Sequence, residues 1–107
     1  MKKYNKLVRD NIPEIIRADG ENPKIKILQD EEYKKELLKK LVEEAAEAAA
    51  AGGSKKELMK EIGDIEEVIG AIINGYGLDK SEIEKLRAER KQSRGGFDKK
   101  IFLEYTE

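Results

Sequence analysis

Four carboxylates recur at matched positions in the stretch from Leu41 to Val68, which reads LVEEAAEAAAAGGSKKELMKEIGDIEEV. Their spacing is Glu-x-x-Glu in the first half and Glu-x-x-Asp in the second, and the residues are Glu44, Glu47, Glu61 and Asp64. Residues three apart lie on the same side of a helix, about one turn from each other. Two such pairs placed side by side would gather carboxylate oxygens, the ligands that hard divalent cations prefer.

The first acid of each pair falls within an apolar stripe. Each helical residue advances by about 100° around the axis, which places Glu44 in the same arc as Leu41 and Glu61 in the same arc as Ile65. The second acid of each pair lies at the edge of its stripe. Like charges in a half-buried patch raise one another's pKa or require a counter-ion. The pattern therefore predicts a cation held by oxygen ligands, with Mg²⁺, Mn²⁺ and Ca²⁺ as the candidates.

Composition excludes several other kinds of site. The chain of 107 residues has no cysteine and no histidine. Disulfides, thiolate or imidazole metal sites, cysteine nucleophiles and Ser-His-Asp triads are therefore excluded. Charged residues make up 42% of the chain, with both signs interleaved and a net charge of -1. This balance argues against binding of duplex nucleic acid by bulk charge.

The length of the chain predicts one domain, residues 1–107. No apolar run reaches the length of a signal peptide core or of a membrane span. We therefore expect a cytoplasmic location and no membrane partner. A domain of this size buries a modest share of its surface, so association with a second copy would stabilise it.

The N-terminal third predicts a short helix followed by an extended segment. Pro13 suits a first helical turn and Gly20 suits a stop, so we expect a helix from about Ile12 to about Ala18. In the following ENPKIKILQ, Ile25 and Ile27 alternate with lysines, which predicts a short strand or an extended segment.

The centre of the chain predicts a helical hairpin. Asp30 is expected to cap a helix that runs to about Ala51 and stops at Gly52-Gly53. Ser54 to Glu57 form a capping box that opens a second helix, which runs to about Asn74. The short turn makes the two helices antiparallel neighbours.

The C-terminal third predicts a shorter polar helix over LDKSEIEKLRAERKQS, a loop over RGGFDKK, and a strand over IFLEY. This last strand could pair with KIKIL to form a two-stranded ribbon resting on a helical surface. The predicted fold class is thus all-α, with a helical-hairpin core and a minor two-stranded β ribbon.

These motifs resemble those of a known family. EEAAE followed by EIGD is similar to the Glu-x-x-Glu and Glu-x-x-Asp signature of the MazG-like nucleotide pyrophosphohydrolases, in the all-α NTP pyrophosphatase superfamily. The ends, YNKLVRDNIPEII and RGGFDKKIFLEY, are similar to those of a small stand-alone branch labelled phosphoribosyl-ATP pyrophosphohydrolase-like. The resemblance covers nearly the whole chain. It implies a four-helix-type bundle completed by association into a homodimer or a higher homo-oligomer.

The resemblance also implies a reaction. It is the hydrolysis of a nucleoside triphosphate to a nucleoside monophosphate and pyrophosphate with Mg²⁺ (or Mn²⁺), which would remove non-standard or surplus nucleotides. Glu44, Glu47, Glu61 and Asp64 would hold the metal. A carboxylate not fully engaged with metal could orient or deprotonate the attacking water. Glu44 and Glu47 are the candidates for this catalytic role, and the choice between them stays open.

A triphosphate also requires cations. Lys6 and Arg9 in NKLVRD are candidate substrate-binding residues, as are Arg90, Lys91 and Arg94 before the second Gly-Gly pair. Arginine suits these contacts because its guanidinium binds phosphate oxygens through two hydrogen bonds.

Two other functions fit the same residues. One is a phosphoribosyl-ATP pyrophosphohydrolase of histidine biosynthesis, whose substrate carries an added sugar phosphate. The other is a non-catalytic helical interaction module whose acids pair with a basic partner. The second predicts binding without turnover and without dependence on metal.

Overall fold

The computed structural model describes residues 2–107 and contains four helices. They are α1 (Ile12–Ala18), α2 (Asp30–Ala50), α3 (Lys55–Tyr76) and α4 (Lys80–Arg94). No strand occurs in residues 2–107, so the predicted all-α class is confirmed. No helix in this part of the chain is long and apolar enough to cross a membrane. The structure divides into two units, residues 2–77 and 78–107.

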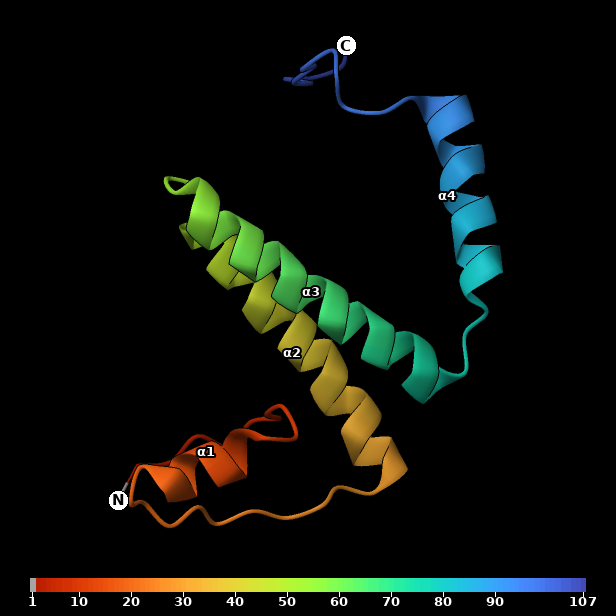
Figure 1. Cartoon of the computed structure of the whole chain (residues 1–107). Helices are drawn as coiled ribbons and strands as arrows, with labels where there is room; N and C mark the ends of the chain where they lie inside the picture. Colours follow the sequence, from red (N-terminus) through yellow and green to blue (C-terminus); the bar gives the residue numbers. More distant parts are fainter. Residues whose placement is uncertain (1) are drawn as a thin grey trace. The chain divides into compact units, whose positions relative to one another are not determined.

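Helices α2 and α3 form the predicted antiparallel hairpin and lie side by side (Figure 1). The Ser54 hydroxyl accepts a hydrogen bond of 3.3 Å from the backbone N–H of Glu57, which fixes the start of α3. At its other end, Gly77 adopts a left-handed φ of 64°, a conformation that glycine reaches at little cost. Helix α2 begins at Asp30 with Gln29 as its N-cap residue, so it starts one residue earlier than expected, and it has no side-chain cap.

Few side chains are buried between α2 and α3. Its buried apolar side chains are Leu37 and Ala48, which are 2% and 9% exposed. Gly75 of α3 lies against Leu37, because a Cβ at Gly75 would stand only 3.2 Å from the Leu37 Cδ1 atom. The third buried residue of the hairpin is an acid, Glu44, which is 7% exposed. The hairpin therefore positions a carboxylate where a close-packed core would place an apolar side chain.

Residues 2–11 lead into α1, which has the predicted bounds. Asn11 is the N-cap residue, although its side chain makes no capping hydrogen bond, and Pro13 occupies the first turn. The backbone turns at Asn5, whose φ is 46°, and again where the Ile12 N–H bonds the Arg9 carbonyl at 3.1 Å. These turns fix the course of the segment that carries Lys6 and Arg9.

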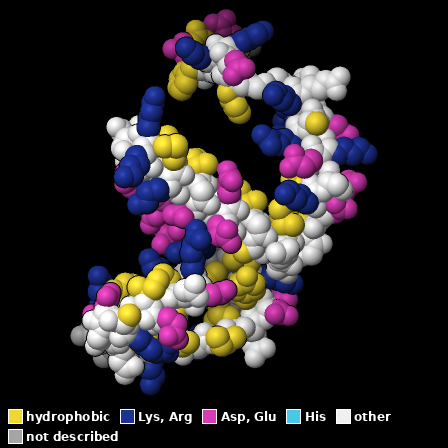
Figure 2. All heavy atoms as spheres, viewed as in Figure 1, with side chains coloured by type: hydrophobic (Ala, Val, Ile, Leu, Met, Phe, Trp, Pro, Cys, Tyr) yellow, Lys and Arg dark blue, Asp and Glu magenta, His cyan; other side chains and the backbone are white. Residues whose placement is uncertain are grey.

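The C-terminal unit consists of α4 and the residues around it. Asp79 caps α4 by accepting hydrogen bonds from the backbone N–H groups of Ser81 (2.9 Å) and Glu82 (3.4 Å). Every residue from 78 to 107 is exposed. Figure 2 shows hydrophobic side chains open on the surface, among interleaved acidic and basic ones.

The predicted β ribbon is not confirmed. Residues 25–28 and 101–105 have no regular secondary structure in the described chain. Ile27, Ile101 and Leu103 are 87%, 81% and 75% exposed. A two-stranded ribbon is marginal unless a surface covers one of its faces. The two segments belong to different units.

Candidate metal centre

Three of the four predicted carboxylates meet between α2 and α3. Glu44, Glu61 and Asp64 each offer one oxygen, and the three oxygens lie within 4.8 Å of one another. Oxygens bound to Mg²⁺ lie roughly 2.1 Å from the ion, so two on opposite sides are separated by about 4.2 Å. The three oxygens could therefore bind a single hard cation if they moved slightly closer together.

Two of the inward oxygens are orphaned. Oε2 of Glu44 and Oε2 of Glu61 are shielded from solvent and have no hydrogen-bond partner among residues 2–107. The Glu44 side chain as a whole is only 10% exposed. Buried polar oxygens normally have a partner, because leaving one unpaired costs free energy. Two shielded, unpaired oxygens on two residues whose carboxylates converge indicate a ligand that the protein itself does not supply.

Glu47 lies beside the trio and outside it. Its side chain is exposed, one turn along α2 from Glu44. Its charge helps to raise the pKa of both Glu44 and Glu61, so it is close to each. The helical spacing correctly placed Glu47 at the edge of the stripe, and this position leaves its carboxylate accessible to water.

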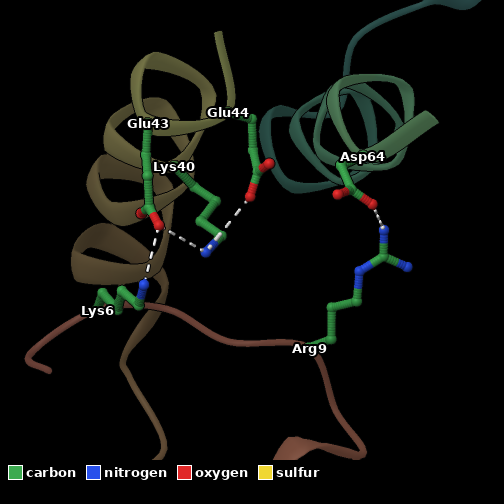
Figure 3. Close-up of polar contacts among 6 residues, drawn as sticks. All are labelled: Lys6, Arg9, Lys40, Glu43, Glu44 and Asp64. Carbon is green, nitrogen blue, oxygen red and sulfur yellow. Dashed lines mark hydrogen bonds and ion pairs between the residues drawn. The ribbon is translucent and has the colours of Figure 1, made fainter. Parts of the chain in front are cut away.

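Lysine and arginine side chains approach the cluster from the outside (Figure 3). Arg9 donates to Asp64 Oδ1 at 2.8 Å, and Lys6 donates to Glu43 Oε1 at 3.0 Å. Lys40 of α2 lies 3.4 Å from Glu43 Oε1 and 3.6 Å from Glu44 Oε1. None of these cations pairs with Oε2 of Glu44 or with Oε2 of Glu61.

The charge count around the trio also favours a divalent cation. When all groups are ionised, the five carboxylates in this neighbourhood exceed the three cations by two negative charges; the groups are Glu43, Glu44, Glu47, Glu61 and Asp64 with Lys6, Arg9 and Lys40. One divalent ion would neutralise this excess. The donor set is all oxygen, which fits Mg²⁺ or Mn²⁺ and not a metal that needs thiolate or imidazole.

Sequence reasoning missed Glu43 and Lys40. The pattern predicts Glu43 to be a solvated surface acid, yet it is half-buried and hydrogen bonded to both Lys6 and Lys40. The spacing from Lys40 to Glu43 and Glu44 is i,i+3 and i,i+4, which was a usable signal for these helical ion pairs. No helical spacing could predict that Lys6, 37 positions away, also reaches Glu43.

The pKa values of the acids separate according to their surroundings. Removal from water raises the pKa of Glu44 and of Glu61, and the charge of Glu47 raises both further. The hydrogen bond from Lys6 lowers the pKa of Glu43, and the same bond raises the pKa of Lys6. In the metal-free protein, the ionised form is therefore disfavoured at two of the inner carboxylates and favoured at Glu43.

A pH dependence of stability follows for the metal-free protein. Above the ordinary glutamate value of 4.5, the folded state holds protons on Glu44 and Glu61 that the unfolded state has lost. The free energy of unfolding should therefore fall as pH rises from 4.5 through the raised pKa values of these two groups. Glu43 acts in the opposite sense, and its stabilisation is lost as pH falls below 4.5. Urea unfolding in EDTA across this range measures the effect.

The control for this pH dependence is the double variant Glu44→Gln/Glu61→Gln, which has neither titrating group. Its free energy of unfolding should lack the decline above pH 4.5. A wild-type profile that matches the double variant would show that the two carboxyls titrate at ordinary values.

The remaining predicted substrate contacts lie on α4. Arg90, Lys91 and Arg94 are exposed, and no ion pair joins them to another residue of the described chain. Their role therefore stays a prediction.

An open hollow adjoins the trio at the turn of the hairpin. Its volume is about 450 Å³, and its lining residues are Glu47, Ala50, Ala51, Gly53, Ser54, Glu57 and Glu61. The small side chains at the end of α2 leave this space open. Glu47 and Glu61 connect it to the carboxylate cluster.

Comparison with known proteins identifies no relative of this chain. Scans against protein-family models, curated proteins and solved structures each found no match.

Proposed function

We propose that this chain is a Mg²⁺-dependent nucleoside triphosphate pyrophosphohydrolase of the MazG-like kind. The observation that carries the proposal is the pair of shielded, unpartnered oxygens on Glu44 and Glu61, two residues whose carboxylates converge with that of Asp64. The motif resemblance at both ends of the chain adds to this support. Clusters of exposed acids are common on helices, but orphaned oxygens within one are not.

The protein groups have distinct roles in the proposed reaction. Glu44, Glu61 and Asp64 would hold the metal, with Glu47 at the edge of the site. When bound, Mg²⁺ would offset the negative charge that develops on the phosphoryl oxygens. Glu47 is the better candidate to orient the attacking water and accept its proton, because it is exposed and lies outside the trio. Water would cleave the anhydride bond between the α- and β-phosphates and release the monophosphate and pyrophosphate.

The space beside the cluster suits a substrate larger than the metal alone. The hollow at the hairpin turn shares Glu47 and Glu61 with the site and is open to solvent. A group attached to the metal-bound phosphates could extend into it. Arg9 pairs with Asp64 on the side away from Glu44 (Figure 3), where it could contact a phosphate.

We also propose that a second copy of the chain covers the hairpin to complete a four-helix-type bundle. Large apolar side chains on α2 and α3 are open to solvent, namely Leu38, Val42, Met59, Ile62 and Ile69 at 42% to 69% exposure. Apolar patches of this kind mark interaction surfaces. Light scattering should give the mass of two or more chains, and a mass of one chain at micromolar concentration would contradict this arrangement.

The test of function is a pyrophosphate-release assay on the purified full chain with a panel of nucleoside triphosphates and phosphoribosyl-ATP. Release with Mg²⁺, and its loss in EDTA with recovery on adding Mg²⁺, is the expected result. Faster turnover of phosphoribosyl-ATP than of every simple triphosphate would favour the histidine-biosynthesis alternative. Absence of turnover with every substrate, together with metal-independent binding of a basic partner, would favour the interaction module.

A further inference from the structure

Within the N-terminal segment, Arg9 contacts one of the three clustered acids directly. Its Nη2 atom donates to Asp64 Oδ1 at 2.8 Å, although the two residues are 55 positions apart. Figure 3 shows the guanidinium reaching Asp64 from the outer side, while the carboxylate of Glu44 faces Asp64 across the gap between α2 and α3. Asp64 thus serves two neighbours, a cation outside and the carboxylate trio inside.

The ion pair between Arg9 and Asp64 is open to solvent and can be broken at low cost. The side chains are 58% and 41% exposed, and ion pairs this open to water hold weakly. Lys40 differs, because it belongs to α2 itself, is 16% exposed and pairs with two acids. Lys6 contacts Glu43, which is not one of the three clustered acids. Of these three cations, Arg9 is therefore the one that lies outside the hairpin and pairs with a member of the trio, Asp64.

We propose that Arg9 is a displaceable counter-ion of the metal centre: it neutralises Asp64 when no metal is bound, and it transfers to a phosphate of the substrate once a divalent cation is held by the trio. The inference rests on the proposed function. Its physical basis is that Arg9 and the metal compete for the charge of one carboxylate. A guanidinium that loses its carboxylate partner has the fork geometry to bind two phosphate oxygens.

Competition of this kind is reciprocal. If the metal weakens the hold of Asp64 on Arg9, then Arg9 weakens the hold of Asp64 on the metal by the same factor. Removing the positive charge of Arg9 should therefore tighten metal binding and, in the same variant, loosen binding of phosphate. A residue whose role is only to hold the N-terminal segment in place would not produce effects of opposite sign.

The experiment measures Mn²⁺ binding by electron paramagnetic resonance at low ionic strength, on the full chain and without nucleotide. The variants are Arg9→Gln and, as a matched control, Arg17→Gln, whose guanidinium pairs with Glu14 within α1. We expect Arg9→Gln to bind Mn²⁺ about three- to tenfold more tightly than wild type, from a screened charge a few Å from the ion. Arg17→Gln should match wild type. Thermal unfolding checks that the variants are folded.

The second measurement is the affinity for inorganic pyrophosphate at saturating Mn²⁺, by calorimetry. Arg9→Gln should bind pyrophosphate about tenfold more weakly, the scale expected for one lost charge-assisted contact. Wild type that binds Mn²⁺ while Arg9→Gln shows equal or weaker Mn²⁺ affinity would overturn this inference and leave the proposed function standing. Unchanged pyrophosphate affinity would likewise overturn it. Wild type that binds no Mn²⁺ would overturn the proposed function, and the inference with it.

Discussion

Glu61→Gln is expected to abolish Mg²⁺-dependent pyrophosphate release while the protein remains folded. The substitution keeps the shape of the side chain and replaces an anionic ligand with a neutral amide. Loss of even a group that supports a metal ligand costs about 10- to 100-fold, so loss of a ligand should reduce release by at least about 100-fold. The fold should persist because Glu61 is half-buried and faces Glu44, Glu47 and Asp64, whose repulsion the substitution relieves.

The matched control is Glu66→Gln, on the same helix. Glu66 is exposed and is not among the clustered acids. Pyrophosphate release by this variant should equal that of wild type. Normal release by Glu61→Gln, measured alongside it, would rule out the proposed site.

Glu44→Gln is expected to change metal affinity and stability in opposite directions. The loss of an anionic ligand should weaken Mn²⁺ binding by about 100-fold. In EDTA at neutral pH the free energy of unfolding of the variant should exceed that of wild type by roughly 1 kcal/mol. The reason is that the Glu44 carboxylate is only 7% exposed, so the wild type must either bury its charge or bind a proton there, and a neutral glutamine does neither. Lys40 keeps Glu43 as a partner, so no unpaired buried cation results.

Urea unfolding and Mn²⁺ titration of the same preparation measure both effects. Glu66→Gln again serves as control, since it removes one acid from an exposed position and should move neither quantity by much. If Glu44→Gln were less stable than wild type in EDTA, the Glu44 carboxylate would stabilise the fold, which would contradict its proposed role as a metal ligand that costs stability.

Helical periodicity and capping chemistry predicted most of the fold. The bounds of α1 follow from Pro13 and Gly20, and the start of α3 follows from Ser54, whose hydroxyl makes the expected capping bond. The end of α3 lies at Tyr76, two residues beyond the expected Asn74, because the left-handed stop is made at Gly77. These features are local, so a short stretch of sequence contains the information that fixes them.

The inner part of the candidate site was also predictable, for the same reason. A rotation of about 100° per residue places Glu44 and Glu61 inside apolar stripes, and a short turn brings the stripes together. The structure confirms that Glu44 is buried and that Glu44, Glu61 and Asp64 converge. Glu47 lies beside the cluster, one turn along α2 from Glu44, and its side chain is exposed.

Contacts between non-helical segments and the hairpin were not predictable. The pairs Arg9–Asp64 and Lys6–Glu43 depend on where residues 2–11 cross the helices, and no periodicity encodes that path. The β ribbon is not confirmed, for a related reason. Alternation of apolar residues shows that a segment can form a strand, but not that a partner and a covering surface are present.

Glu44 and Asp64 lie close together in the sequence, and this closeness affects the folding kinetics. Interactions between residues close in sequence form fast, because closing a short loop loses little chain entropy. The trio of Glu44, Glu61 and Asp64 should therefore come together as the hairpin forms, before slower steps bring residues 2–11 into place. A cation present during refolding would encounter its ligands early and could speed the collapse of the very helices that present them.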